Sequence, residues 1–109
     1  MSVSDEYITY VLDQLACFGE VESRRMFGGA GIYCNGLFFA IIADDVLYFK
    51  VDGTNRAEYE EAGMEAFQPF PDKSYLMSYY EVPVEVLENR DKLTEWAGKS
   101  MNVAMRKKK

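Results

Sequence analysis

The sequence contains no histidine and only two cysteines, and both scarcities narrow the chemistry that the protein can perform. Histidine is the usual general base near neutral pH and the commonest metal ligand, so its absence removes the simplest acid–base and metal sites. Cys17 and Cys34 are too few for a disulfide scaffold, and two separated cysteines cannot complete a structural zinc site. We therefore expect buried thiols, no cofactor or metal, and no catalytic residues.

Basic residues are also in the minority. The chain has 12 Lys and Arg against 18 Asp and Glu, which gives a net charge of −6, and four of the positive charges stand together at residues 106–109. The rest of the domain is more acidic still and repels phosphate, so we do not expect direct DNA binding. The alternative, in which the basic end contacts DNA, predicts salt-sensitive binding that is lost when residues 106–109 are removed.

Long apolar runs are missing as well. None approaches the roughly 20 residues that a membrane-spanning helix needs, and the first residues, MSVSDEY, are acidic and lack the apolar segment of a secretory signal. The sequence therefore predicts a cytoplasmic protein without a membrane partner. With 109 residues, 49% of them hydrophobic and 15% aromatic, it also predicts a single domain over residues 1–109 with one core.

Two turn signals organise the apolar residues that are present. Asp44-Asp45 joins two apolar stretches within LFFAIIADDVLYFKV (37–51), and Asn35-Gly36 is a strong hairpin signal before them. The sequence thus predicts three consecutive antiparallel strands. The Asp-Asp turn predicts the pairs Ala43–Val46, Ile42–Leu47, Ala40–Phe49 and Phe38–Val51, and the Asn-Gly turn predicts Cys34–Leu37, Tyr33–Phe38 and Ile32–Phe39.

This register divides the strands into two faces. One face is wholly apolar and is expected to be the core, whereas the other carries apolar residues with Lys50 as its single charge. A solvent-exposed sheet face should be more polar, so this second face is a candidate surface for a protein partner or for a second copy in a homodimer, with an exposed sheet edge as the alternative surface. The candidate partner surface consists of Leu37, Phe39, Ile41 and Tyr48.

The flanking segments complete an α+β domain. A helix is predicted from about Ser4 to Phe18, a short helix from Asn55 to Gly63, and helices from Pro83 to about Arg106. Between them, strands are predicted at residues 65–70 and 74–81. The expected architecture has two layers, an antiparallel sheet with helices packed on it.

The glycine-rich segment MFGGAG (26–31) invites a phosphate-binding interpretation. A strand follows it instead of a helix N-terminus, so close crossing of strands or a bulge explains the glycines better. An alternative function remains open here, a small-ligand-binding protein or enzyme. Its pocket beside this strand would be lined by Arg24 or Arg25 with Tyr79 and Tyr80.

Four blocks in order resemble the N-terminal domain of the TfoX/Sxy family. They are RRMFGGAGIY (24–33), FFAIIADDVLYFKVD (38–52), NRAEYEEAG (55–63) and MSYYEVPVEVLENRDKLTEWA (77–97). The resemblance implies a secretion-chaperone-like α+β fold and an association with transcriptional regulators of natural competence, which act with the cyclic-AMP receptor protein. Full-length members carry a second, C-terminal helical domain, which we do not expect in this chain. We therefore expect a stand-alone, non-enzymatic regulatory or protein-interaction domain.

Overall fold

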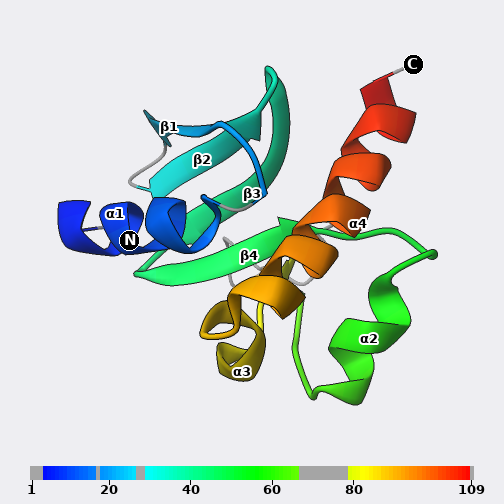
Figure 1. Ribbon diagram of the computed structural model, residues 1–109. Coiled ribbons are helices and arrows are strands. Elements are labelled where there is room, and N and C mark those ends of the chain that lie inside the picture. Colours follow the sequence, from blue (N-terminus) through cyan, green and yellow to red (C-terminus); the bar gives the residue numbers. More distant parts are fainter. Residues whose placement is uncertain (1–3, 17, 27–28, 67–78, 109) are drawn as a thin grey trace.

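A computed structural model describes residues 4–16, 18–26, 29–66 and 79–108. The order of its elements is α1 (Asp5–Gln14), β1 (Val21–Met26), β2 (Gly29–Cys34), β3 (Leu37–Ala43), β4 (Val46–Lys50), α2 (Arg56–Glu61), β5 (Tyr79–Glu81), α3 (Val84–Leu87) and α4 (Arg90–Lys108). The strands form one antiparallel sheet in the order β1-β2-β3-β4-β5 (Figure 1). The predicted α+β fold, a sheet with helices packed on it, is confirmed.

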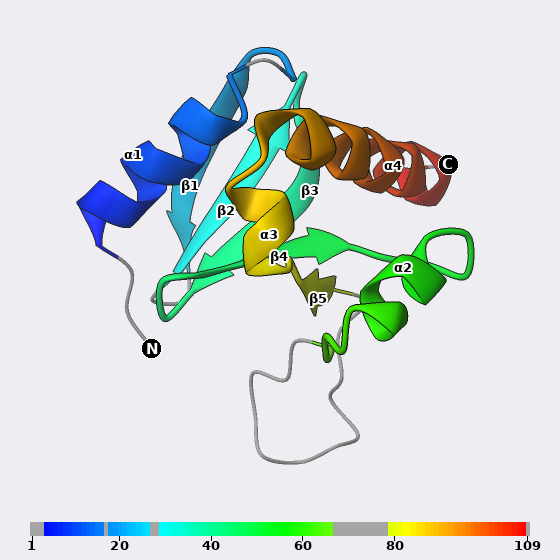
Figure 2. The same ribbon diagram turned by 60° about the horizontal axis from the view of Figure 1, so that its bottom comes forward.

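The helices pack on one side of the sheet, which we call the helix face. Figures 1 and 2 show α1 and α4 on this side with α3 beside α4. Apolar residues of α1, α3 and α4 form one buried cluster with strand residues of this face, among them Ala40, Ile42, Leu47 and Phe49. None of the described helices combines the length and apolar composition that crossing a bilayer requires.

Both predicted two-residue turns are present. Asn35 and Gly36 have φ values of 53° and 78°, and Asp44 and Asp45 have values of 52° and 56°. Residues with short polar side chains, and glycine, tolerate this left-handed backbone, which is why these dipeptides close the hairpins. The predicted pairs Cys34–Leu37, Tyr33–Phe38, Ala43–Val46, Ile42–Leu47 and Ala40–Phe49 are confirmed.

The predicted pair Ile32–Phe39 is wrong because β3 contains a bulge. Ile32 lies opposite Ala40 while the next residue, Tyr33, lies opposite Phe38, so Phe39 has no counterpart on β2. An extra residue in one strand reverses which side chains point to each face beyond it. Phe39 therefore turns to the helix face, where it is 0% exposed and its ring lies 5.6 Å from that of Phe18.

The same bulge overturns the predicted partner surface of Leu37, Phe39, Ile41 and Tyr48. Leu37 and Phe39 belong to the helix face with the core, whereas Ile41 and Tyr48 lie opposite each other on the other side of the sheet. Phe38, which was predicted to face the core opposite Val51, instead points to the other side of the sheet, where it contacts Tyr79. Val51 is buried in the core, so the predicted pair Phe38–Val51 is wrong. We call the side that carries Phe38, Ile41 and Tyr48 the second face.

Gly29 allows β2 and β3 to approach closely. A Cβ atom built on Gly29 would lie 2.3 Å from the carbonyl oxygen of Ile42, a backbone atom that cannot move away cheaply. The close crossing of strands predicted for the glycine-rich segment is thereby confirmed at this residue. Gly28 lies outside the described residues.

The helices differ from expectation mainly at their ends. The Ser4 hydroxyl accepts a hydrogen bond from the Tyr7 amide and caps α1, but α1 ends at Gln14 rather than near Phe18. After Gln14 the backbone makes hydrogen bonds between residues three apart, as in a 3-10 helix: Ala16 N donates to Asp13 O and Phe18 N donates to Leu15 O. Of the two strands predicted over residues 65–70 and 74–81, the structure shows β5 and a bridge at Ala66, and residues 67–78 lie outside the described part.

The bulge makes a prediction about Phe38 and Phe39. Phe39→Ala should lower the free energy of unfolding by about 3–5 kcal/mol, because it empties a fully buried site. Phe38→Ala should cost clearly less, because Phe38 is only half-buried. Urea unfolding of both variants measures the difference, and an equal or reversed order would contradict the bulged register.

A second prediction concerns Gly29. Gly29→Ala should destabilise the protein by about 1–3 kcal/mol, because the new methyl group collides with the Ile42 backbone. Gly53→Ala is the matched control, since its Cβ would make ordinary contact, 3.5 Å, with the end of the flexible Arg56 side chain. Thermal unfolding should show a lower midpoint for the first variant only.

Candidate functional site

The second face carries a row of side chains that crosses the sheet. In order from β1 to β5, the row consists of Arg24, Tyr33, Phe38, Lys50 and Tyr79. Alternation along each strand places these residues on the side away from the helices. Ile41, Val46 and Tyr48 flank the row on β3 and β4.

Neighbours in the row contact one another through their rings. The rings of Tyr33 and Phe38 are stacked with centroids 5.1 Å apart and an interplanar angle of 26°, and the Phe38 and Tyr79 centroids are 5.7 Å apart. Arg24 Cζ lies 4.9 Å from the Tyr33 ring centroid, and Lys50 Nζ lies 4.9 Å from that of Tyr79. Toward each end of the row a cation therefore lies over an aromatic ring, an arrangement that is favourable for both partners.

This stacking limits what the row can bind. Single-stranded nucleic acids bind to sheets by laying bases on free aromatic faces. Here Tyr33 and Phe38 stack on each other, and Arg24 lies over the Tyr33 ring. The half-buried Tyr33 and Phe38 therefore offer mainly their ring edges to another molecule. An apolar partner that packs on these edges suits the geometry better than a stacked base.

Tyr79 and Lys50 form the more buried end of the row. Burial raises the pKa of Tyr79 to about 12, so its phenol stays protonated at neutral pH. The Lys50 ammonium donates a hydrogen bond of 3.3 Å to the Tyr79 hydroxyl oxygen. Nearby, burial and the charges of Glu81 and Asp44 raise the pKa of Tyr48, which keeps this phenol neutral too.

The residues predicted for a ligand pocket are divided between the two faces. Arg24 and Tyr79 lie on the second face but at opposite ends of the row. Arg25 lies on the helix side, where it pairs with Asp5, and Tyr80 packs on Tyr59 with a centroid distance of 5.8 Å. The expectation that Arg24 or Arg25 joins Tyr79 and Tyr80 around one pocket is therefore wrong, because neighbouring strand residues alternate in direction.

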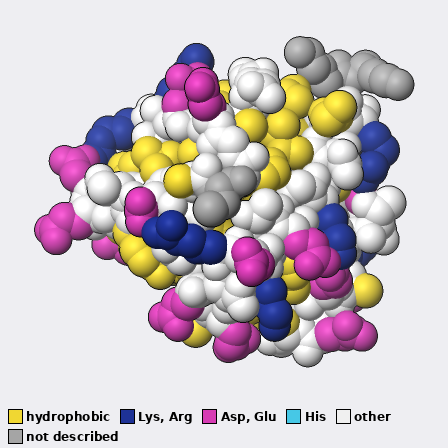
Figure 3. Space-filling model, in the orientation of Figure 1, with side chains coloured by type: hydrophobic (Ala, Val, Ile, Leu, Met, Phe, Trp, Pro, Cys, Tyr) yellow, Lys and Arg dark blue, Asp and Glu magenta, His cyan; other side chains and the backbone are white. Residues whose placement is uncertain are grey.

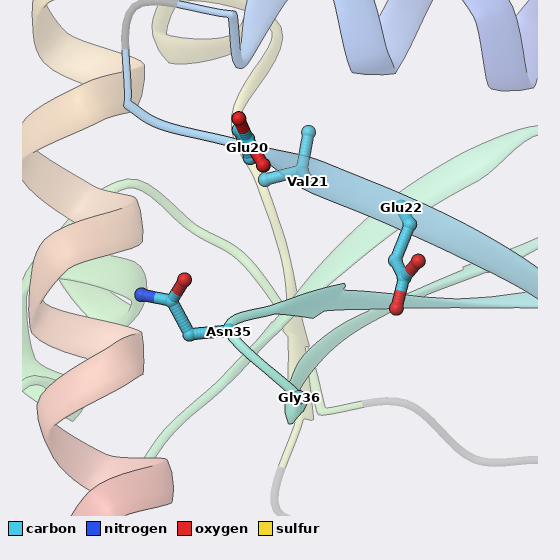
Figure 4. A pocket seen from close by; sticks show the side chains of 5 residues that line it. All are labelled: Glu20, Val21, Glu22, Asn35 and Gly36. Atoms are coloured by element: carbon cyan, nitrogen blue, oxygen red, sulfur yellow. The ribbon is translucent and has the colours of Figure 1, made fainter.

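A depression of about 230 Å³ lies at a different place. It is lined by Glu20, Val21 and Glu22 at the start of β1 and by Asn35 and Gly36 in the β2–β3 turn (Figure 4). Its charged side chains are carboxylates, which disfavour phosphate and other anionic ligands. Glu22 is in addition paired with Arg24 at 3.7 Å. We find no chemical reason to assign this depression a ligand.

Cysteines and possible metal ligands are the reactive groups that the sequence left to be placed. Cys34 is a buried free thiol, as predicted, and burial together with the charge of Glu20 raises its pKa, which makes it a poor nucleophile. Cys17 lies outside the described residues. The described part of the chain contains no group of three or more Asp, Glu, Cys or His side chains placed to hold a metal ion.

Charge on the visible surface is mixed. On the side seen in Figure 3, acidic and basic side chains alternate around apolar ones without a continuous basic stretch. Arg106 at the end of α4 donates hydrogen bonds to Asp52 and Thr54. Hydrogen bonds from Thr54, and then Arg106, lower the pKa of Asp52 to about 2. At least one cation of the basic end thus holds α4 to the loop after β4.

The row of side chains could not be predicted without the bulge in β3. A usable signal existed in the alternation of β2, where Ala30, Ile32 and Cys34 form the apolar set. These residues share the core face with Ile42 and Leu47 only if one residue is inserted in β3. Without the bulge, the apolar residues of β2 and β4 would point to opposite sides of the sheet.

Comparison with known proteins agrees with the four sequence blocks. A curated relative, "DNA transformation protein TfoX1" of Aliivibrio fischeri, is 36% identical over 50 residues. The aligned segment covers 46% of this chain and 24% of that relative. The family described as "TfoX N-terminal domain" matches residues 13–104. Since this match spans most of the sequence, the protein belongs to the TfoX N-terminal domain family.

Proposed function

We propose that this domain is a non-enzymatic interaction module of a cytoplasmic regulator related to DNA-transformation proteins, and that it binds a protein partner through the second face. Family membership supports the regulatory part of the proposal. The name of the Aliivibrio fischeri relative supports a connection with DNA uptake by natural competence. The composition and layout of the second face support the binding mode.

The observation that carries the proposal is the layout of this face. Its centre holds Tyr33, Phe38, Ile41 and Tyr48, of which the three aromatic residues are half-buried. Charged residues border the centre, with Glu22 and Arg24 on β1 and Lys50 and Glu81 on β4 and β5. An aromatic, apolar centre with a charged rim is the usual composition of protein–protein interfaces, in which tyrosine is enriched.

Such a surface suits a protein better than DNA. The net charge of −6 opposes approach to phosphates. Tyr33 and Phe38, which would have to stack with bases, already stack with each other, and Phe38 also contacts Tyr79 at a tilt. The edges of the tyrosine rings can instead pack against apolar side chains of a partner, and their hydroxyl groups can donate hydrogen bonds to its backbone carbonyls.

The test places a charge on the centre of the second face. In a naturally transformable host that encodes this chain, Tyr48→Asp and Phe38→Asp should each reduce transformation frequency by about tenfold or more, since burying an unpaired carboxylate in an interface costs at least about 1.4 kcal/mol. Co-purification of the tagged chain should identify a partner that both variants lose.

The matched control is Val84→Asp on α3. Val84 is 59% exposed and belongs to a helix on the opposite side of the sheet, so this variant should keep both the partner and normal transformation. Thermal unfolding of all three variants separates loss of binding from loss of folding. Folded Tyr48→Asp and Phe38→Asp proteins that retain transformation and the partner would refute the proposal.

A further inference from the structure

The strand β1 leaves one edge of the sheet open. It is the outermost strand, and among the described residues it is hydrogen-bonded to β2 alone. The opposite edge is different, because β5 has only three residues and the segment at Glu65–Ala66 pairs with it through the bridge Ala66–Tyr80 and a bond from Glu81 N to Glu65 O of 3.3 Å. Every second residue of this six-residue strand has its backbone N–H and C=O pointing away from β2, so β1 presents an open row of donors and acceptors.

β1 also lacks several devices that prevent edge pairing. Its six residues, VESRRM, include no proline, and its register with β2 is uninterrupted from Val21–Cys34 to Met26–Gly29. Glu22 and Arg24 point to the second face, with side chains 63% and 65% exposed. Two opposite charges one step apart on the same face of an edge strand can pair with the same two charges on another copy.

Symmetry limits how two such strands can pair. A two-fold axis perpendicular to the sheet makes the strands antiparallel and keeps each face continuous, so one residue must lie opposite itself. An axis at Glu22 or at Arg24 would place like charges opposite each other. An axis at Ser23 places Glu22 of each copy opposite Arg24 of the other, twice, which is the favourable arrangement.

We propose that a second copy of this chain binds along β1 as an antiparallel strand centred on Ser23. The two sheets become one continuous sheet, and two cross-strand pairs between Glu22 and Arg24 set the register. This inference goes beyond the proposed function, because it uses the sheet edge instead of the second face and names the chain itself as the partner. In Figure 2, α1 runs alongside β1, whereas α4 lies over the sheet away from this edge.

Charge reversal tests the register. Sedimentation velocity at low salt should show a dimer of the unmodified chain. Arg24→Glu should weaken it about tenfold, because it places two like-charged pairs opposite each other. Glu22→Arg combined with Arg24→Glu should restore the original affinity, since the charges are then exchanged and complementary again.

The control variant is Arg25→Glu. Arg25 points to the other face of the sheet and pairs with Asp5 in its own chain. The Arg25→Glu substitution should therefore leave the dimer unchanged. A monomer at high micromolar concentration would overturn the proposal. A dimer that Arg24→Glu does not weaken, or that the double exchange does not restore, would overturn it too, whatever happens at the second face.

A cross-link gives an independent readout. In a chain with Cys17→Ser and Cys34→Ala, Ser23→Cys should form an intermolecular disulfide under mild oxidation, because the two sulfur atoms face each other across the axis. Arg25→Cys in the same background should not, since Val21 of the second copy lies opposite it. Equal cross-linking of both variants would contradict the proposed register.

Discussion

The extra residue in β3 is the constraint on which the rest of this structure depends. Side chains along a strand point alternately to the two faces of the sheet. The apolar residues of β2 and of β4 can therefore cover the same core only if the strand pairing places both sets on the same face. In this sequence the two sets reach the same face only because Phe39 is an extra residue in β3 without a partner on β2. The bulge brings Ala30, Ile32 and Cys34 to the same side as Ile42, Leu47 and Phe49, and the helices close over that single surface.

The second face acquires its character from the same event. Phe38 would belong to the core in a regular sheet, but the bulge turns it outward beside Tyr33 and Tyr79. In the resulting row, the rings contact one another, and Arg24 and Lys50 each lie over a tyrosine ring. The domain therefore places apolar groups on both sides of one sheet, one side sealed by its own helices and the other suited to a partner.

Much of the fold follows from local chemistry that is visible in the sequence. Asn35-Gly36 and Asp44-Asp45 specify their turns because few other residues accept positive φ, and Asn89 caps α4 by accepting hydrogen bonds from the amides of Asp91 and Lys92. The surface was harder to predict. Its composition depends on a single inserted residue, and two adjacent phenylalanines give no local indication of which one points inward. The alternation of apolar residues in β2, compared with the alternation in β4, does indicate that an extra residue must lie between them.

The order of the strands in the sheet is also their order in the chain. β2, β3 and β4 each pair with the strand just before them through a short connection, so their contacts require little loop closure. β5 and α4, by contrast, are separated from the end of β4 by a long stretch of sequence. We expect the β1–β4 meander to form early during folding. The C-terminal half would then dock on a preformed template, so the rate of folding would depend more on residues before Val51 than on those after it.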